Sequence, residues 1–248
     1  MARRLMIGLG AAGALGAAVV GVAVTRDGGK PSPLPAALGT SAPTVCVASH
    51  VVLVEGMTRD CLTSAEFDAL RDRAVIGGDG APVEVNLAAP AGDKAVIRTC
   101  ADYDASVARG WYALTSADMR REEYFKRACG ALSMLVKAAP AATSHFTGGA
   151  ADISDIRSMA NAEATGIGEV EPSAPIDIAE IEDGIWKIVI GQGETMVYEI
   201  AHADFTGDGV GEILAYVSTG VADGTARAGS IGMLEKSAAG GPCTFQPR

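Results

Sequence analysis

Oxygen-bearing side chains recur at short intervals in one loop near the C-terminus, which runs Asp204-Phe205-Thr206-Gly207-Asp208-Gly209-Val210-Gly211-Glu212. Ca²⁺ takes about six to eight oxygen ligands, and loops that bind it alternate these ligands around a glycine that allows a sharp turn. Side chains at the first, third, fifth and ninth positions would then act with the backbone carbonyl at the seventh. The predicted calcium ligands are Asp204, Thr206, Asp208, Val210 and Glu212.

The same loop resembles the calcium-binding hairpins of FG-GAP and VCBS repeats, which follow the pattern Asp-x-Asn-Gly-Asp-Gly-x-x-Asp. Thr206 stands where that family has Asp or Asn, and Glu212 stands where it has Asp. The resemblance implies a β-hairpin with affinity for Ca²⁺. A propeller would need several copies of the repeat, and the sequence holds one. An EF-hand would need a bidentate Glu at the twelfth position, where this chain has Ala215.

A hairpin turn without metal is the competing interpretation of this loop. Glycine-rich segments such as Thr206–Gly209 are favourable turn sequences. Asp204 could close such a turn by accepting hydrogen bonds from its own backbone. Both interpretations predict a hairpin, and the sequence leaves the choice between them open.

Catalytic residues are harder to find than metal ligands. His202 and Asp204 are two residues apart and would share one face of a strand, with Glu212 nearby. A hydrolase that uses His202 with Asp204 or Glu212 is one hypothesis. The sequence contains no H-E-x-x-H, G-x-S-x-G or phosphate-binding loop motif. No catalytic residue is therefore predicted, and the preferred hypothesis is a non-enzymatic binding or envelope-associated module.

The N-terminus has the features of an export signal. Arg3 and Arg4 precede an uninterrupted run without polar side chains, residues 5–24, and together they resemble a twin-arginine signal. This run is also long enough to span a bilayer. Residues 1–25 are therefore predicted to be a signal peptide or membrane anchor, followed by a flexible Pro/Gly/Ser tether over 26–43. The predicted location is periplasmic or extracellular, and the chain resembles many exported bacterial proteins in general character.

Charge and cysteine content agree with that location. The chain has 20 basic and 30 acidic residues, a net charge of −10. Such a chain is unsuited to nucleic acid, whose phosphates require clustered Lys and Arg. An oxidising compartment permits disulfides among the five cysteines, although the sequence does not determine their pairing. Pairing of neighbours along the chain is preferred, which gives Cys46–Cys61 and Cys100–Cys129, with Cys243 free or paired otherwise.

The elements that position these residues indicate an α+β fold. Residues 44–140 are expected to mix helices and strands, 141–173 to be a weakly structured connection, and 174–248 to form an antiparallel β-sheet. Helices are predicted at 63–73, 116–138 and 153–164. Strands are predicted at 45–54, 82–87, 95–99, 176–181, 185–191, 195–204, 211–218 and 227–235.

The helix over 116–138 carries the clearest pattern. Apolar residues recur along one face. Glu122–Lys126 and Glu123–Arg127 are pairs with helical i,i+4 spacing, so this charged run is expected to be a solvated face.

Overall fold

The computed structural model describes residues 42–57, 60–163, 175–222, 224 and 227–248. The predicted signal or anchor and nearly all of the predicted tether lie outside these ranges. Within them, no helix has both the length and the apolar character needed to cross a membrane.

The described residues contain four α-helices and a large antiparallel sheet, which confirms the α+β class. The helices are α1 (Ser64–Leu70), α2 (Cys100–Val107), α3 (Ser116–Leu135) and α4 (Ile153–Glu163), with a short 3-10 turn η1 (Thr147–Gly149). The N-terminal strands are β1 (Thr44–Cys46), β2 (Cys61–Thr63), β3 (Val85–Ala88), β4 (Lys94–Ile97) and β5 (Tyr112–Ala113). The later strands are β6 (Thr143–Ser144), β7 (Ile176–Glu182), β8 (Ile185–Ile190), β9 (Gly193–Ala203), β10 (Val210–Val221), β11 (Arg227–Lys236) and β12 (Cys243–Pro247).

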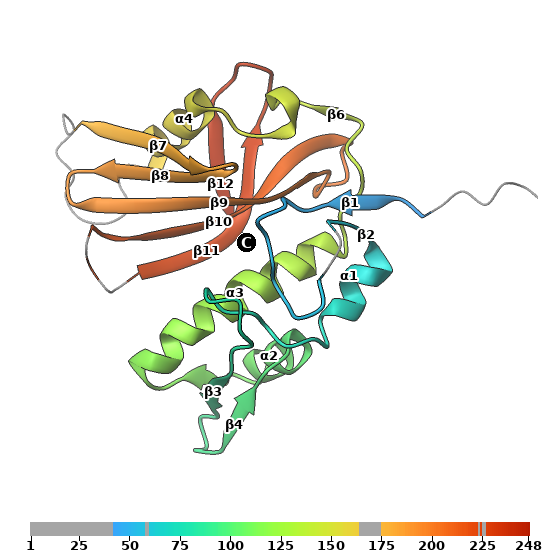
Figure 1. Ribbon diagram of the computed structural model, residues 1–248, viewed down its shortest axis with the longest axis vertical. Helices are drawn as coiled ribbons and strands as arrows, with labels where there is room; N and C mark the ends of the chain where they lie inside the picture. Colours follow the sequence, from blue (N-terminus) through green and yellow to red (C-terminus); the bar gives the residue numbers. More distant parts are fainter. Residues whose placement is uncertain (1–41, 58–59, 164–174, 223, 225–226) are drawn as a thin grey trace, which may run out of the picture. The chain divides into compact units, whose positions relative to one another are not determined.

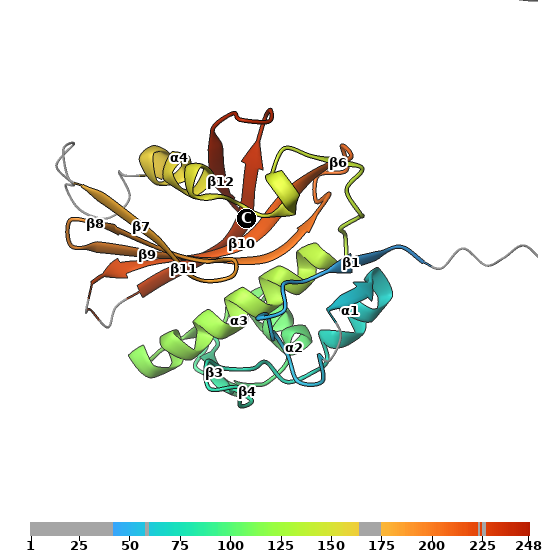
Figure 2. The same ribbon diagram turned by 45° about the horizontal axis from the view of Figure 1, so that its top comes forward.

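The main sheet is an antiparallel meander in the order β12-β11-β10-β9-β8-β7, and β6 adds to β10 in parallel. Two smaller sheets, β1-β2 and β4-β3-β5, belong to the N-terminal half. Helix α3 lies across one face of the main sheet and α4 across the other (Figures 1 and 2). Both faces of the main sheet are therefore covered by helix.

Helix α3 begins at its N-cap Thr115, whose side chain accepts a hydrogen bond from the Asp118 backbone. Its buried residues recur at helical spacing and include Phe125, Ala128, Cys129, Ala131, Leu132 and Leu135. A Cβ on Gly130 would lie only 2.6 Å from Ile231 Cγ2 in β11, so the glycine allows the helix to approach the sheet closely. The first core cluster forms around this contact.

Helix α4 forms the second core cluster against the opposite face. Asp152 caps the helix by accepting hydrogen bonds from the Ser154 and Asp155 backbones. This cluster includes Ile156, Met159 and Ala160 of α4 and Trp186, Val197 and Leu234 of the sheet. The helix predicted at 153–164, inside the expected connection 141–173, is thus present as α4 and packs on the sheet. The remainder of that connection, 164–173, lies outside the described residues.

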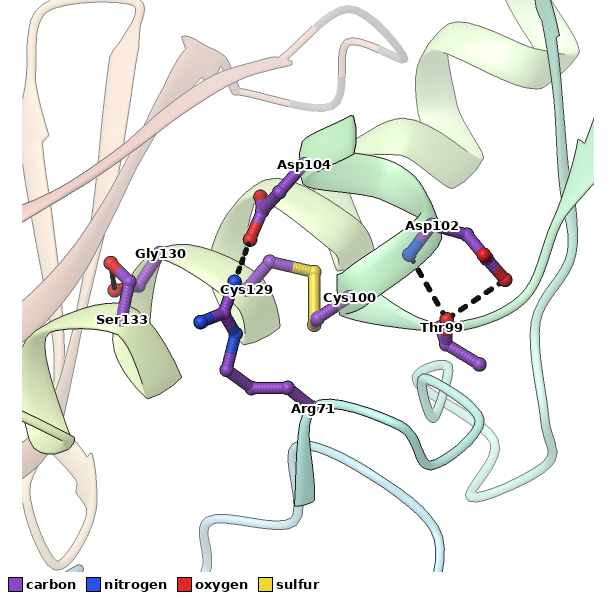
Figure 3. The surroundings of a disulfide bond; sticks show 8 residues. All are labelled: Arg71, Thr99, Cys100, Asp102, Asp104, Cys129, Gly130 and Ser133. Carbon is purple, nitrogen blue, oxygen red and sulfur yellow. Dashed lines mark hydrogen bonds and ion pairs between the residues drawn. A yellow bond between two sulfur atoms is a disulfide. The ribbon is translucent and has the colours of Figure 1, made fainter. Parts of the chain in front are cut away.

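Both preferred disulfides are confirmed. Cys46–Cys61 joins β1 to β2, and Cys100–Cys129 joins α2 to α3 (Figure 3). Arg71, just after α1, forms an ion pair of 2.8 Å with Asp104 of α2 beside the second bridge. Cys243 is free and buried. The two disulfides indicate an oxidising, extracytoplasmic location.

Several local predictions need correction. The strand expected at 45–54 ends at Cys46, and Val47 and Val54 make only isolated bridges. Helix α2 and strand β12 were not predicted. The pattern of apolar residues is weak in both elements, which explains this omission. Asp and Ser interrupt the apolar residues of α2, and Pro precedes β12.

The charged run on α3 is not simply solvated. Glu123 accepts hydrogen bonds from the Tyr216 hydroxyl at 3.0 Å and the Gly229 backbone at 3.2 Å, both in the sheet. Lys126 pairs with Glu122 as predicted and also with Glu123. Arg127 lies over the Tyr124 ring instead. The face was misassigned because the sheet covers part of it.

Candidate metal site in the β9–β10 hairpin

The predicted calcium loop connects β9 to β10, the two longest strands of the sheet. Gly207 and Gly209 have φ values of 83° and 84°, in the left-handed region that glycine enters without steric penalty. These two glycines allow the chain to turn sharply between Asp204 and Val210. The hairpin that both sequence interpretations required is therefore present.

Asp204 is buried at the start of the turn, and both of its carboxylate oxygens accept backbone hydrogen bonds. Oδ1 accepts from Gly207 N at 2.6 Å and Oδ2 from Gly209 N at 2.8 Å. Desolvation opposes ionisation, but the backbone N–H donors outweigh it and hold the pKa of Asp204 below its usual value. Asp204 is thus kept negatively charged inside the loop.

Glu212 lies at the start of β10 and is also buried. Its carboxylate accepts hydrogen bonds from Phe205 N at 2.9 Å and the Thr206 hydroxyl at 3.1 Å. Desolvation raises the pKa of Glu212, and the nearby Asp208 and Asp204 carboxylates raise it further. The two buried acids of the loop therefore differ in how readily they ionise.

The turn brings three carboxylates together. Oxygen atoms of Asp204, Asp208 and Glu212 all lie within 4.8 Å of one another. The ion pairs formed in the described part of the chain do not involve these three residues. Oxygen ligands in such a group suit Ca²⁺, which binds them at about 2.3–2.6 Å.

The other two predicted ligands occupy the same loop in different roles. The Thr206 hydroxyl donates to Glu212, so it lies at the edge of the carboxylate group. Val210 donates its backbone N–H to Asp208 Oδ1 at 2.8 Å, which orients that exposed carboxylate. The structure thus unites all five predicted residues in one hairpin and brings the three acidic ones into a single group.

A segment that sequence reasoning missed holds the hairpin from one side. Asp204 and Ala139 exchange backbone hydrogen bonds of 2.8 and 2.9 Å, and Ala142 N donates to Gly209 O at 3.0 Å. Residues 139–144 follow the end of α3 and include β6. The hairpin is therefore fastened to the chain that leaves the main helix, a contact across about 65 residues that no local pattern indicates.

His202 does not join the acidic group through any hydrogen bond found among the described residues. Its Nε2 lies 2.9 Å from the hydroxyl of Ser144 in β6. Desolvation lowers the pKa of His202, which favours the neutral ring. The Ser144 hydroxyl also accepts the Phe146 backbone N–H at 3.0 Å. This arrangement places His202 as a contact between β9 and β6, and sequence reasoning did not pair it with Ser144.

No family model matches this chain, and neither the curated proteins nor the solved structures include a significant match. Function is therefore inferred from the geometry of the hairpin.

Proposed function

We propose that the protein is an exported, non-enzymatic binding or envelope-associated module whose β9–β10 hairpin binds Ca²⁺. The observation that carries the calcium assignment is the group formed by Asp204, Asp208 and Glu212, whose oxygen atoms lie within 4.8 Å. The two disulfides support a compartment outside the cytoplasm, where calcium sites of moderate affinity are commonly used. Residues 1–25 supply the export signal or the anchor.

Calcium has a structural role in this proposal. Three negative charges in a small volume repel one another, and a divalent cation between them removes that repulsion. Because the hairpin is bonded to residues 139–144, a bound ion would stabilise both the β9–β10 pair and its connection to α3. Binding to the folded state at about 100 times the dissociation constant adds about 2.7 kcal/mol to the free energy of unfolding.

Replacing Asp208 with Asn is expected to weaken calcium binding by about tenfold or more, because it removes a charged ligand. The asparagine side chain keeps an oxygen that can accept the Val210 N–H, so the turn itself should persist. The measurement is calorimetric titration of the metal-free chain with CaCl₂. The matched control is Asp93→Asn, which changes an exposed acid in the turn between β3 and β4. Equal affinity in Asp208→Asn and wild type would exclude the hairpin as the site.

Calcium binding should also weaken as the pH falls. The ion needs ionised Glu212, whose folded-state pKa lies above its ordinary value. Protons therefore compete with Ca²⁺ at a pH higher than the usual glutamate pKa of about 4.3. In the absence of calcium, the stability of the fold depends on pH in the opposite direction. Protonation of Glu212 then stabilises the folded state as the pH falls through the raised pKa of Glu212. Calcium titrations at several pH values test this, and an affinity that stays constant down to a pH of about 4.3 would contradict it.

A further inference from the structure

A second candidate site lies in the N-terminal half, away in sequence from the calcium hairpin. Residues 77–79 and 82–84, with Arg121 and Tyr124 of α3, line an open pocket of about 570 Å³. Sites for small molecules usually measure about 300–1,000 Å³, so this pocket has room for one. Its two walls differ in charge, since Asp79 and Glu84 line one side and Arg121 and Tyr124 the other.

The acidic wall includes a hydrogen-bonded turn. Gly77 N donates to Ala81 O at 2.8 Å, Gly80 N donates to Gly77 O at 3.1 Å, and Ala81 N donates to Asp79 Oδ1 at 3.1 Å. These bonds fix the Asp79 carboxylate while leaving it exposed. Glu84 follows on the same wall, where an ion pair of 2.6 Å with Arg98 orients its side chain. The wall therefore presents two positioned carboxylates.

The helical wall presents a cation and an aromatic ring at i,i+3 spacing. Arg121 Nη1 lies 3.8 Å from Asp118 Oδ1, which is beyond hydrogen-bond length, and the Arg121 side chain is 53% exposed. Asp118 in turn is held by the Thr115 hydroxyl at 2.6 Å and the Asn86 amide at 2.9 Å. The Arg121 guanidinium is thus attracted to Asp118, whose position is fixed, but forms no hydrogen bond with it.

Tyr124 lies on the helical wall, close to the turn that forms the acidic wall. A Cβ on Gly78 would lie 3.0 Å from the Tyr124 hydroxyl, so the glycine turn and the ring are in close contact. Arg127 lies over the ring with its guanidinium carbon 5.6 Å from the ring centre. These contacts hold the ring in place as a surface on which an apolar or aromatic group can pack.

We propose that this pocket binds a small zwitterion of dipeptide size. Its ammonium group would lie against Asp79 and Glu84, and its carboxylate would accept hydrogen bonds from Arg121. Its side chain would pack on Tyr124. Among the described residues, the two walls form no ion pair with each other: Arg121 pairs with Asp118 at 3.8 Å, Glu84 pairs with Arg98, and Asp79 has no cationic partner. A ligand with opposite charges at its ends complements both walls.

This inference rests on the proposed function in one respect: the proposed function is a binding module, and the inference names the class of ligand that the module binds. It does not depend on calcium, since the pocket and the hairpin share no residue. Calcium titration and dipeptide titration can therefore fail separately. A chain that binds calcium but no zwitterion would overturn only the present inference.

The test is calorimetric titration of the full chain with the dipeptide alanyl-tyrosine at concentrations up to about 10 mM. The same peptide with an acetylated N-terminus, and the same peptide with an amidated C-terminus, each lack one of the two charges. Each is expected to bind about tenfold more weakly, as the loss of a charged hydrogen bond predicts. Absence of binding by the free dipeptide, or equal binding by all three peptides, would overturn the proposal.

Two variants locate the binding. Arg121→Gln should abolish the preference for a free C-terminal carboxylate, and Asp79→Asn should reduce the preference for a free N-terminal amine. The matched control is Arg120→Gln, which removes an exposed arginine from the adjacent position on α3, outside the pocket lining. Affinity unchanged in Arg121→Gln would place the binding elsewhere, and an equal loss in Arg120→Gln would assign it to general charge. Either result would contradict the proposed site.

Discussion

Replacing Lys236 with Met is expected to lower the free energy of unfolding by about 3–5 kcal/mol, because it leaves a buried carboxylate without its partner. Lys236 Nζ lies 2.5 Å from Asp155 Oδ1, and the two side chains are only 6% and 4% exposed. The ammonium also lies over the Phe146 ring, 5.3 Å from its centre. The pair joins β11 to the first turn of α4, so the loss should loosen the helix on the sheet. Urea unfolding followed by circular dichroism measures it.

An exposed ion pair provides the control for Lys236. Arg98 and Glu84 are 60% and 52% exposed, so Arg98→Met should change stability far less than Lys236→Met does. The double variant Lys236→Met with Asp155→Leu should recover part of the lost stability, because no unpaired charge remains buried. A Lys236→Met effect as small as that of Arg98→Met would show that the pair is not buried in solution.

Removal of the Cys100–Cys129 bridge is expected to have the second large effect on the free energy of unfolding. The bridge closes a loop of 29 residues, and in the loop-entropy model this stabilises the fold by about 3.5 kcal/mol. Both cysteines are almost fully buried between α2 and α3 (Figure 3). The double variant Cys100→Ala with Cys129→Ala keeps the site apolar, so that its unfolding midpoint in urea reports mainly on the lost cross-link.

The other bridge serves as a comparison within the same chain. Cys46 and Cys61 are exposed and close a loop of 15 residues, for which the same model gives about 3 kcal/mol. The double variant Cys46→Ala with Cys61→Ala should therefore lose less stability than the Cys100/Cys129 variant. A stability of the Cys100/Cys129 variant equal to that of wild type would contradict the assigned pairing.

Local signals were sufficient for much of the fold. The predicted helix at 63–73 begins at a capping box formed by Thr63 and Glu66, and the Thr115 side chain likewise caps α3. The sheet strands follow from β-branched and apolar runs separated by glycine-containing turns. The same logic would have found α2, because Thr99 accepts a hydrogen bond from Asp102 N as its cap. Its short, weakly periodic sequence concealed that signal.

Contacts made across long sequence distances were not predictable in this way. A sheet with one solvated face should place polar residues outward, but α3 and α4 cover both faces. Glu199 is therefore buried, with its carboxylate accepting the Trp186 indole N–H at 2.9 Å, and desolvation raises its pKa. Likewise the contact between His202 and Ser144 depends on β6 lying beside β10.

The candidate site itself was largely predictable because it is local. All five predicted ligands lie within nine consecutive residues, and turn chemistry alone brings Asp204, Asp208 and Glu212 together. Two features could not be predicted. One is the burial of Asp204 and Glu212, and the other is the attachment of the hairpin to residues 139–144. Both depend on where the end of α3 meets the sheet.

The most direct test of the calcium assignment is the melting temperature of the full chain, first in EDTA and then in excess CaCl₂. Calcium at about 100 times its dissociation constant should raise the melting temperature by roughly 5–10 °C. An equal concentration of MgCl₂ should raise it less, because Mg²⁺ retains its water and demands a stricter geometry. The rise should be largely lost in Asp208→Asn and retained in Asp93→Asn. An unchanged melting temperature of the wild-type chain in millimolar calcium would contradict the account.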